Sequence, residues 1–484
     1  MMTSLLWVRT MFLICWITIF IPFVRSFCSS YYYHYYYSPT HHHVTVEPPV
    51  STQLYSIDHL NNKHGYEFHI APMQCYTNLA LRKLFSLLSP SSILWTEMEK
   101  VSDILQPNQS NDHHSLVNVW SKRLGSPKNT NNDRNNDENE QSKLILQLGC
   151  SDAAMLKTCV SQTLSDYNRL KGINLNCGCP SIESGGASNY GAKLMKDTHL
   201  TGELVHVMKE AVMEQGLSSS ISVKCRIGII DSFDDIRPLN QENDYEYLNQ
   251  YISTIKDAGA DHVILHARPA ILSGLSPVKN RLVPELNYDI VERIASDFSD
   301  LRITLNGGIV GLDQYNTMIE RMSKSHISSH MAGRWCLRRP LDLIGIESML
   351  MEGSMVRISI VKAIDEYIEF AIQSILSGQN QISVADLCLP LYLVSEQLKE
   401  DYSYEHDSED VSSIKPILSI DEIEEASNVL SRGVKEISSL SNGKRETHYY
   451  DSNDVVNFRK LSKSLKSIVG SKVVNKWSRN RAEL

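Results

Sequence analysis

The sequence repeats one pattern eight times between Glu67 and Gly333: a short apolar β-type run, a polar or glycine-containing stop, and a longer stretch of helical periodicity. Strands that alternate with helices pair in parallel through right-handed crossovers, so this pattern strongly limits the possible folds. Eight such units predict an α/β fold, a (β/α)8 barrel of the TIM type. An open doubly wound sheet would instead carry a Gly-x-Gly-x-x-Gly turn after its first strand, and none occurs there. The predicted strands are Phe68–Pro72, Ile93–Glu97, Leu144–Leu148, Ile173–Asn176, Val223–Arg226, His262–His266, Ile303–Asn306 and a shorter one near His330–Gly333.

The length of 484 residues is too great for one ordinary domain, and 42% hydrophobic with 21% charged residues is typical of soluble globular proteins. We predict a targeting leader with a disordered segment over 1–60, the barrel over 61–350, and a smaller all-α domain over 351–484, where apolar residues recur every three to four positions. The barrel is interrupted by a polar stretch with six Asn between 129 and 142. Its low hydrophobicity predicts a disordered insertion over 104–142.

The first 60 residues have the composition of a targeting segment. Arg9 precedes an apolar run from Met11 to Val24, and the following stretch to Thr52 is rich in Tyr, His, Ser and Thr, with Glu47 its only acid. This order resembles the two-part leader of proteins sent to secondary plastids, so we expect an organellar protein, with the plastid favoured. A mitochondrial protein, or a signal anchor or signal peptide of the secretory pathway, remains an alternative. After removal of the leader we expect no stable membrane association.

Polar residues or glycines stand at or just past the end of every predicted strand, and in barrel enzymes that face holds the active site. The glycines of Asn306-Gly307-Gly308 and Gly333-Arg334 follow strands seven and eight, where barrel enzymes usually bind phosphate. Lys224 and His266 could stabilise negative charge on a reduced flavin, and Gln147 could form a hydrogen bond with the polar edge of the flavin ring. FMN, with one phosphate and a large ring, suits such a barrel mouth, although sugar phosphates fit these residues equally well.

Several ordered motifs resemble those of the tRNA-dihydrouridine synthases. They include Ala71-Pro72-Met73, Leu146-Gln147-Leu148-Gly149, Asn174-Leu175-Asn176-Cys177-Gly178-Cys179-Pro180, Val223-Lys224-Cys225-Arg226 and Leu305-Asn306-Gly307-Gly308. The stretch from His266-Ala267-Arg268 to Asn280-Arg281 resembles the A-type branch of that family in particular.

The resemblance implies an FMN enzyme that uses NADPH to reduce the C5–C6 bond of a uracil in the tRNA D-loop. It makes Cys179 the expected general acid, since a thiol with an ordinary pKa of about 8.5 is protonated at neutral pH yet able to give up its proton. No metal site is predicted, because the Cys177/Cys179 pair has no second Cys/His pair at ligand spacing. The expected FMN contacts are Pro72, Met73, Gln147, Lys224, His266, Asn306, Gly307, Gly308, Gly333 and Arg334. The expected tRNA contacts are Asn176, Arg268, Asn280 and Arg281.

Taken over the whole chain, the net charge of −9 argues against a polyanionic partner such as a nucleic acid. Glu396–Glu425, however, holds eleven acids and two lysines, which we interpret as an acidic connector, whereas Phe458–Leu484 holds eight Lys/Arg and one acid. We predict that this last segment is a basic helix that tracks the phosphates of tRNA. We expect a monomer.

Two rival functions remain open from the sequence. One is a flavin-dependent barrel oxidoreductase that acts on a free pyrimidine, which the Leu275-Ser276-Pro277 motif and the basic C-terminal segment oppose. The other is a tRNA-binding protein without catalysis, which the intact Cys179 and phosphate motifs oppose.

Overall fold

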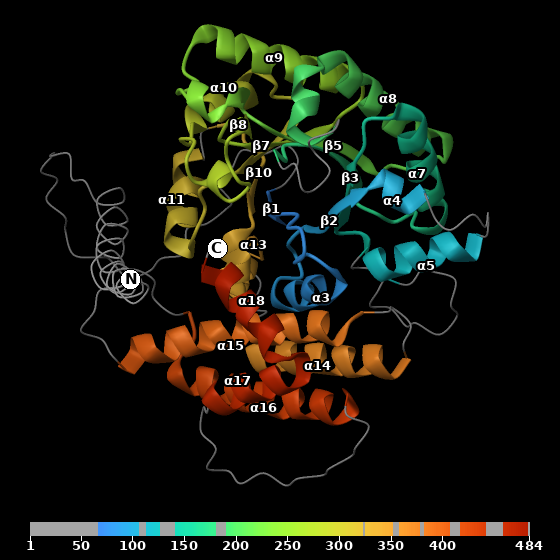
Figure 1. Ribbon diagram of the computed structural model, residues 1–484. Helices are drawn as coiled ribbons and strands as arrows, with labels where there is room; N and C mark the ends of the chain where they lie inside the picture. Colours follow the sequence, from blue (N-terminus) through green and yellow to red (C-terminus); the bar gives the residue numbers. More distant parts are fainter. Residues whose placement is uncertain are drawn as a thin grey trace, which may run out of the picture. The chain divides into compact units, whose positions relative to one another are not determined.

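The computed structural model describes residues 66–105, 113–125, 141–180, 190–322, 325–351, 358–377, 382–406, 417–441 and 458–482. Its main sheet consists of β1 (Glu67–Ile70), β2 (Leu94–Lys100), β3 (Leu144–Gly149), β4 (Gly172–Cys177), β5 (Ser220–Arg226), β7 (His262–His266), β9 (Arg302–Asn306) and β10 (Ser329–Ala332). All pairs are parallel, in the order β1-β10-β9-β7-β5-β4-β3-β2. The ring closes because the Ile70 amide donates to the Ile93 carbonyl at 2.9 Å and the Ile93 amide to the Phe68 carbonyl at 2.8 Å. The predicted (β/α)8 barrel is confirmed (Figure 1).

The strands were predictable because helices cover the outside of the barrel and side chains fill its inside. All residues of β3, β4 and β7 are buried, which explains their nearly continuous apolar runs. The helices of the barrel are α3 (Leu79–Leu88), α4 (Val101–Leu105), α5 (His113–Leu124), α7 (Ala153–Asp166), α8 (Thr198–Glu214), α9 (Glu242–Asp257), α10 (Tyr288–Asp297), α11 (Leu312–Met322), α12 (Arg334–Arg338) and α13 (Leu343–Leu350).

Inside the barrel, an apolar layer separates two polar ones. A buried cluster unites Ala71, Ile93, Trp95, Ile145, Ile264 and Met331. On one side of it, the Trp95 indole N–H donates to His69 Nδ1 at 3.2 Å, and at the amino ends of the strands Glu67 pairs with Lys171 at 2.6 Å. The opposite side faces the carboxyl ends of the strands, where Ala71 and Met331 form part of a cavity wall.

The structure corrects the prediction that 104–142 is one disordered insertion. Helix α5 lies within this range, and its Trp120 and Leu124 are 2% and 4% exposed in the hydrophobic core. These two apolar side chains provide an anchor that the polar average of the segment concealed. Residues 106–112 and 126–140, which include the six Asn, lie outside the described residues.

A small second sheet was not predicted. Its strands β6 (Ile229–Ser232) and β8 (Ala270–Ser273) pair in parallel and come from the loops after β5 and β7. Each strand has only four residues, too short to give a clear alternating pattern. The pairing joins the two loops at the mouth of the barrel.

The C-terminal helices are α14 (Ile360–Ser377), α15 (Val384–His406), α16 (Ile420–Ser441), α17 (Phe458–Val469) and α18 (Ser471–Ala482). Helices α14 and α15 pack against α3 of the barrel, and Asn78 Nδ2, at the start of α3, donates to Asp386 Oδ1 at 3.3 Å. Helices α16 and α17 pack on the side of α14 and α15 that faces away from the barrel (Figure 1). None of the described helices has both the length and the apolar character needed to cross a membrane.

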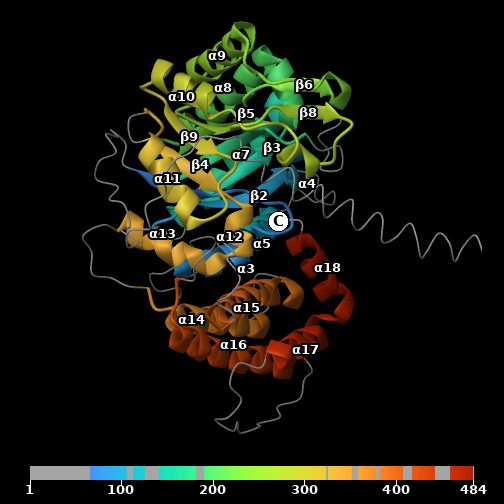
Figure 2. The same cartoon turned by 90° about the vertical axis from the view of Figure 1, so that its left-hand side faces the viewer.

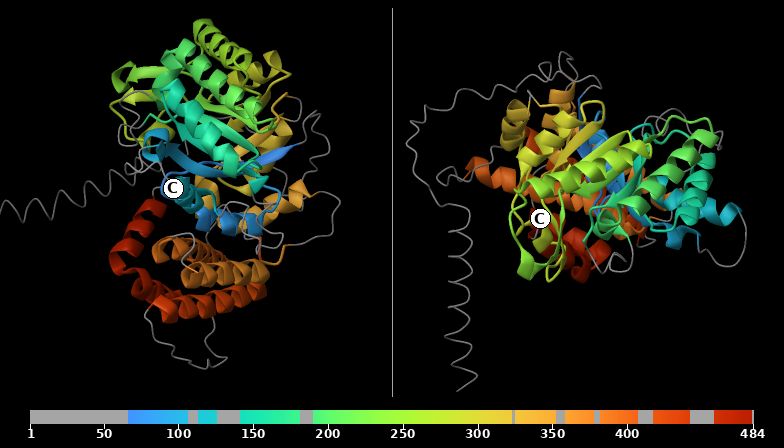
Figure 3. Two further views of the ribbon diagram at one scale, coloured as in Figure 1. Left: turned by 90° about the vertical axis from the view of Figure 1, so that its right-hand side faces the viewer. Right: turned by 90° about the horizontal axis from the view of Figure 1, so that it is seen from above.

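The predicted single basic helix is in fact two. Gly470, with a φ of +83°, ends α17, and α18 runs from there in a new direction toward the barrel (Figures 2 and 3). A left-handed glycine at this position is a common helix terminator, because it has no Cβ to oppose the positive φ.

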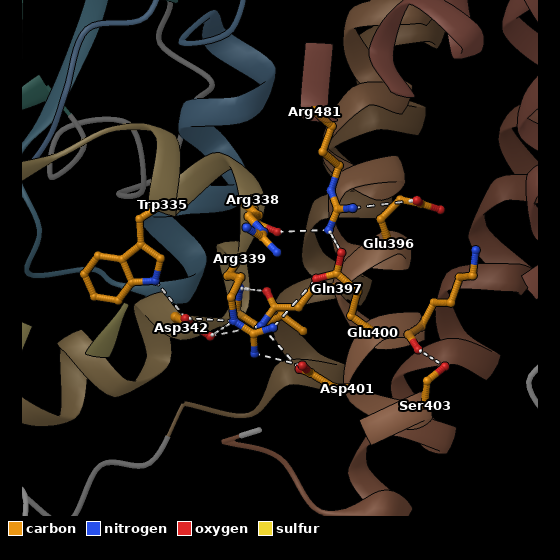
Figure 4. Close-up of polar contacts among 12 residues, drawn as sticks. Trp335, Arg338, Arg339, Asp342, Glu396, Gln397, Glu400, Asp401, Ser403 and Arg481 are labelled. Carbon is orange, nitrogen blue, oxygen red and sulfur yellow. Dashed lines mark hydrogen bonds and ion pairs between the residues drawn. The ribbon is translucent and has the colours of Figure 1, made fainter. Parts of the chain in front are cut away.

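The predicted acidic connector, residues 396–425, contains parts of two helices. Residues 396–406 are the last turns of α15, and Ile420–Glu425 begin α16, while 407–416 lie outside the described residues. Acids of α15 neutralise arginines that are themselves nearly buried. Arg339 donates to Asp401 Oδ1 at 2.8 Å and contacts Asp342 at 3.1 Å, and all three side chains are at most 4% exposed (Figure 4). Part of the negative charge therefore joins α15 to the end of the barrel.

Candidate active site

A cavity of ≈ 560 Å³ opens at the carboxyl ends of the barrel strands. It brings together residues from loops that are far apart in the sequence, because all parallel strands of a closed barrel end at the same face. All ten predicted FMN contacts line it: Pro72, Met73, Gln147, Lys224, His266, Asn306, Gly307, Gly308, Gly333 and Arg334. Cys179 and two of the predicted tRNA contacts, Asn176 and Arg281, line it as well.

The turn that carries Cys179 is fixed by Asn176 at the end of β4. Asn176 Oδ1 accepts from the amides of Gly178 at 3.2 Å and Cys179 at 3.1 Å. Its amide nitrogen donates to Gln147 Oε1 at 2.9 Å, so a neighbouring strand holds the side chain in place. Asn176 therefore positions the cysteine from a residue that is itself 8% exposed in the cavity wall.

Gly191 supports the same turn from the other side. Its φ is +74°, and a Cβ there would lie 2.6 Å from the Cys179 carbonyl oxygen. The neighbouring Ala192 amide donates to that oxygen at 2.9 Å. Only glycine allows this close approach. Cys179 is partly exposed, whereas Cys177 is fully buried and burial raises its pKa to about 12, which keeps Cys177 a neutral core residue.

Two basic residues of the cavity have strongly perturbed pKa values. Burial, together with the charge of Arg226, lowers the pKa of Lys224 to about 8. Burial and the positive charges of neighbouring arginines and of Lys224 hold the pKa of His266 well below its ordinary value. His266 is therefore a neutral imidazole, and its buried Nδ1 has no hydrogen-bond partner in the described part of the chain.

The wall of the cavity is positively charged. Lys224, Arg226, Arg281 and Arg334 contribute to it, and no Asp or Glu occurs among the described residues that line it. A concave surface with one sign of charge concentrates ligands of the opposite sign. No group of three or more His, Cys, Asp or Glu side chains in the described ranges is arranged to hold a metal ion. The cavity thus favours an anionic ligand.

Glycines leave space at the end of the cavity formed by β9 and β10. Gly307 and Gly308 have φ values of +107° and +84°, and a Cβ on Gly307 would lie 3.2 Å from the His266 ring. A Cβ on Gly333 would lie 3.0 Å from Met73 Sδ. Backbone amides are accessible to a ligand where side chains are absent, and phosphate is commonly bound in this way.

The family model described as dihydrouridine synthase matches residues 69–369, which is more than half of the chain. The chain belongs to the dihydrouridine synthase family. It is similar to the tRNA-dihydrouridine(20/20a) synthase of Shewanella oneidensis, with 31% identity over 63% of this chain and 78% of the relative. The enzyme of the same name from Pseudomonas syringae pv. tomato is 32% identical over 67% of this chain and 84% of the relative. That of Escherichia coli strain K12 is 30% identical over 62% and 75%.

Two predicted tRNA contacts of this dihydrouridine synthase do not line the cavity. Asn280 is fully buried, with its amide nitrogen donating to the Ile271 carbonyl at 2.9 Å and its Oδ1 accepting from the Ile271 amide at 2.8 Å. Its side chain is engaged in holding the 270–281 loop, and its contact with tRNA stays a prediction. Arg268 donates to the Pro284 carbonyl and so supports the same region from outside the cavity.

Several residues that line the cavity were not among the predicted contacts, including Arg226, Tyr76 and Asn480. Arg226 Nε donates to the Gly178 carbonyl at 3.1 Å, and its Nη1 donates to the Asn280 carbonyl at 3.2 Å, so it links the cysteine turn to the loop that carries Arg281. Its position two residues after Lys224 on one strand was an available signal, since such residues share a face. Asn480 lies beyond the matched family region, and no motif indicated it.

Proposed function

We propose that this dihydrouridine synthase reduces uridine to 5,6-dihydrouridine in the D-loop of tRNA, with FMN as cofactor, NADPH as reductant and Cys179 as general acid. The observation that carries the proposal is the position of Cys179. Its partly exposed side chain borders a cavity whose wall includes four cationic side chains and several glycines, and two separate elements hold its backbone. A thiol at a positively charged cavity suits proton donation next to a bound anionic cofactor.

The cavity residues fit FMN. The buried Nδ1 of His266 has no hydrogen-bond partner among the described residues, and the glycine-lined end offers space for a phosphate beside Arg334. The flavin, when bound, would supply a hydride for C6 of the uracil. It would be held by Pro72, Met73, Gln147, Lys224, His266, Asn306, Gly307, Gly308, Gly333 and Arg334.

The chain itself supplies the proton and the orientation. The Cys179 thiol gives its proton to C5 of the uracil and becomes a thiolate. Asn176 and Gly191 hold the turn that carries Cys179 in place. The positive charge of Lys224 stabilises negative charge that develops nearby. Neutral His266 can donate or accept one hydrogen bond without adding a proton of its own.

The names of the relatives support a choice of substrate position. They are tRNA-dihydrouridine(20/20a) synthases, and with the A-type motif from His266 to Arg281 they favour uridines 20 and 20a. The target base has to leave its stack to enter a cavity of this size, so recognition by RNA shape and base extrusion is expected.

Mapping dihydrouridine in the tRNAs of cells that lack this protein tests the proposal. We expect loss of the modification at positions 20 and 20a, with other positions unchanged. The same tRNAs should regain it when the full chain is restored, and should not regain it with the Cys179→Ala chain. Retention of dihydrouridine at both positions in the deleted cells would contradict the proposal.

We also propose that the protein acts in an organelle, with the plastid favoured, on the composition of residues 1–60. A fusion of these residues to a fluorescent protein should accumulate in plastids. Accumulation in mitochondria or along the secretory pathway would contradict this choice. Separate analysis of plastid and cytosolic tRNAs in the deleted cells would then identify which pool is the substrate.

A further inference from the structure

Helix α18 is docked by one face. Val474 is 2% exposed, and the Trp477 ring lies 5.5 Å from that of Tyr392 on α15. Ser478 Oγ and the Tyr392 hydroxyl are 2.8 Å apart. Positions 474, 477 and 478 share one side of a helix, so these contacts fix the rotation of α18 about its axis. Lys472, Lys476 and Arg479 are left exposed.

Arg481 fixes the far end of α18. Its Nη2 lies 2.8 Å from Glu400 Oε1 and donates to the Arg338 carbonyl at 3.3 Å, while its Nη1 is 3.8 Å from Glu396 (Figure 4). The side chain is 12% exposed, which makes this arrangement stronger than an ordinary surface ion pair. It holds the end of the helix beside α12, the helix that follows β10.

The neighbouring residue Asn480 consequently reaches the active-site cavity. It lines the cavity together with Leu337 of α12, and in the described part of the chain it is the one residue of α14 to α18 that does so. The middle of α18 lies near the loop after β1, since the charge of Lys476 acts on Cys75 there. The helix therefore borders the cavity mouth on the β1–β10 side.

This side of the mouth lies opposite the catalytic cysteine. In the closed ring of eight strands, β4 is four strands from β10 in either direction, and the Cys179 turn follows β4. A nucleotide that presents its base to Cys179 has to enter between that turn and the opposite rim. Asn480 stands on this rim, on a helix whose exposed side is basic.

We infer that Asn480 is a specificity-determining residue for the RNA substrate: its side-chain amide hydrogen-bonds the nucleotide strand at the cavity mouth and orients the target nucleotide opposite Cys179. An uncharged amide offers both donors and an acceptor, as needed for a base edge or a ribose hydroxyl. Asn480 lies outside the matched region 69–369, so this contact is an addition to the family's barrel. The inference rests on the proposed function.

The test compares Asn480→Ala with Asn475→Ala in the full-length, flavin-loaded protein. Asn475 is on the same helix, is exposed and does not line the cavity, so it is a matched control. The substrate is tRNA purified from cells that lack dihydrouridine. Loss of one hydrogen bond should raise the KM for tRNA about fivefold in Asn480→Ala, with kcat changed less than about twofold. Asn475→Ala should match the wild type.

A second measurement separates RNA contact from cofactor contact. Flavin affinity and the rate of flavin reduction by NADPH without tRNA should be the same in Asn480→Ala and wild type. The inference would be overturned if Asn480→Ala kept the wild-type KM for tRNA, or if this KM rose equally in Asn480→Ala and Asn475→Ala. Weakened flavin binding in Asn480→Ala would also overturn it. If the wild type itself forms no dihydrouridine, the proposed function has failed, which is a distinguishable result.

Discussion

Lys224 is a cavity residue whose surroundings lower its pKa. Burial and Arg226 oppose its charge, and the resulting pKa of about 8 places its titration close to physiological pH. An anion bound beside it favours the charged form, so ligand binding and proton binding are coupled.

The affinity for FMN should therefore depend on pH. Below pH 8 Lys224 is already protonated and the affinity is highest; above pH 8 binding has to include proton uptake, so the affinity falls, by at most about tenfold per pH unit. Titration of the flavin-free protein by quenching of flavin fluorescence between about pH 7 and pH 9 measures this slope. Lys224→Met should bind FMN more weakly and without the slope. If the affinity of the wild type for FMN does not change with pH, Lys224 is not the group that couples FMN binding to proton uptake.

Cys179 and Cys177 offer a matched pair of substitutions two residues apart. Cys179→Ala should keep flavin and tRNA binding and reduce dihydrouridine formation by at least about a hundredfold, because the proposed proton donor is removed. Cys177→Ala changes only a buried neutral thiol and should retain most of the activity. Single-turnover measurement with pre-reduced flavin isolates the relevant step. Similar losses in the two variants would mean that Cys179 acts only through packing.

Among the structural elements, the junction between α12–α13 and α15 depends on one arginine. Arg339 is 4% exposed and lies between Asp342 and Asp401. Arg339→Ala leaves both carboxylates buried without their positively charged partner, and should lower the free energy of unfolding by about 3–5 kcal/mol.

The exposed neighbour Arg338 provides the control. Arg338→Ala should change the free energy of unfolding by less than about 0.5 kcal/mol, as surface substitutions usually do. Urea denaturation followed by circular dichroism gives both values. Equal stability of the two variants would show that the buried ion pairs are not what holds the helices to the barrel.

The exposed side of α18 should contribute electrostatic affinity for tRNA. Changing Lys472, Lys476 and Arg479 together to Gln should weaken tRNA binding and flatten its dependence on salt, by about 0.7–0.9 in the logarithmic slope for each phosphate that is no longer neutralised. Lys362→Gln, at an exposed position of α14, should leave the slope unchanged. Fluorescence anisotropy at increasing KCl concentrations measures both. An unchanged slope in the triple variant would remove α18 from the phosphate-binding surface.

At the scale of the whole chain, the barrel and most of the cavity could be predicted from the sequence. Strands such as β3 and β7 are buried on both faces, so their apolar runs were continuous, and the barrel then brought the residues after each strand to one face. The prediction that Gly307 and Gly308 contact a phosphate could be made from the sequence, because this role depends on the absence of a side chain.

The features that the sequence did not predict depend on contacts between segments that are far apart in the chain. Asn280 was expected at the RNA, yet its side chain completes a loop whose shape no local pattern specified. The acids of α15 resembled a connector in the sequence, because their largely buried partners Arg339 and Arg481 lie 62 and 81 residues away along the chain. The contacts of Arg481 are also what hold α18 beside the cavity, so Asn480 could be found only in three dimensions.

The reaction itself is the most direct measurement. Purified full-length protein, loaded with FMN and supplied with NADPH, is incubated with tRNA that lacks dihydrouridine, and the product is mapped by mass spectrometry. We predict a gain of two hydrogens at uridines 20 and 20a, and no gain with Cys179→Ala or when the substrate is free uracil. A flavin-loaded protein that binds tRNA and leaves every uridine unchanged would contradict the proposed function.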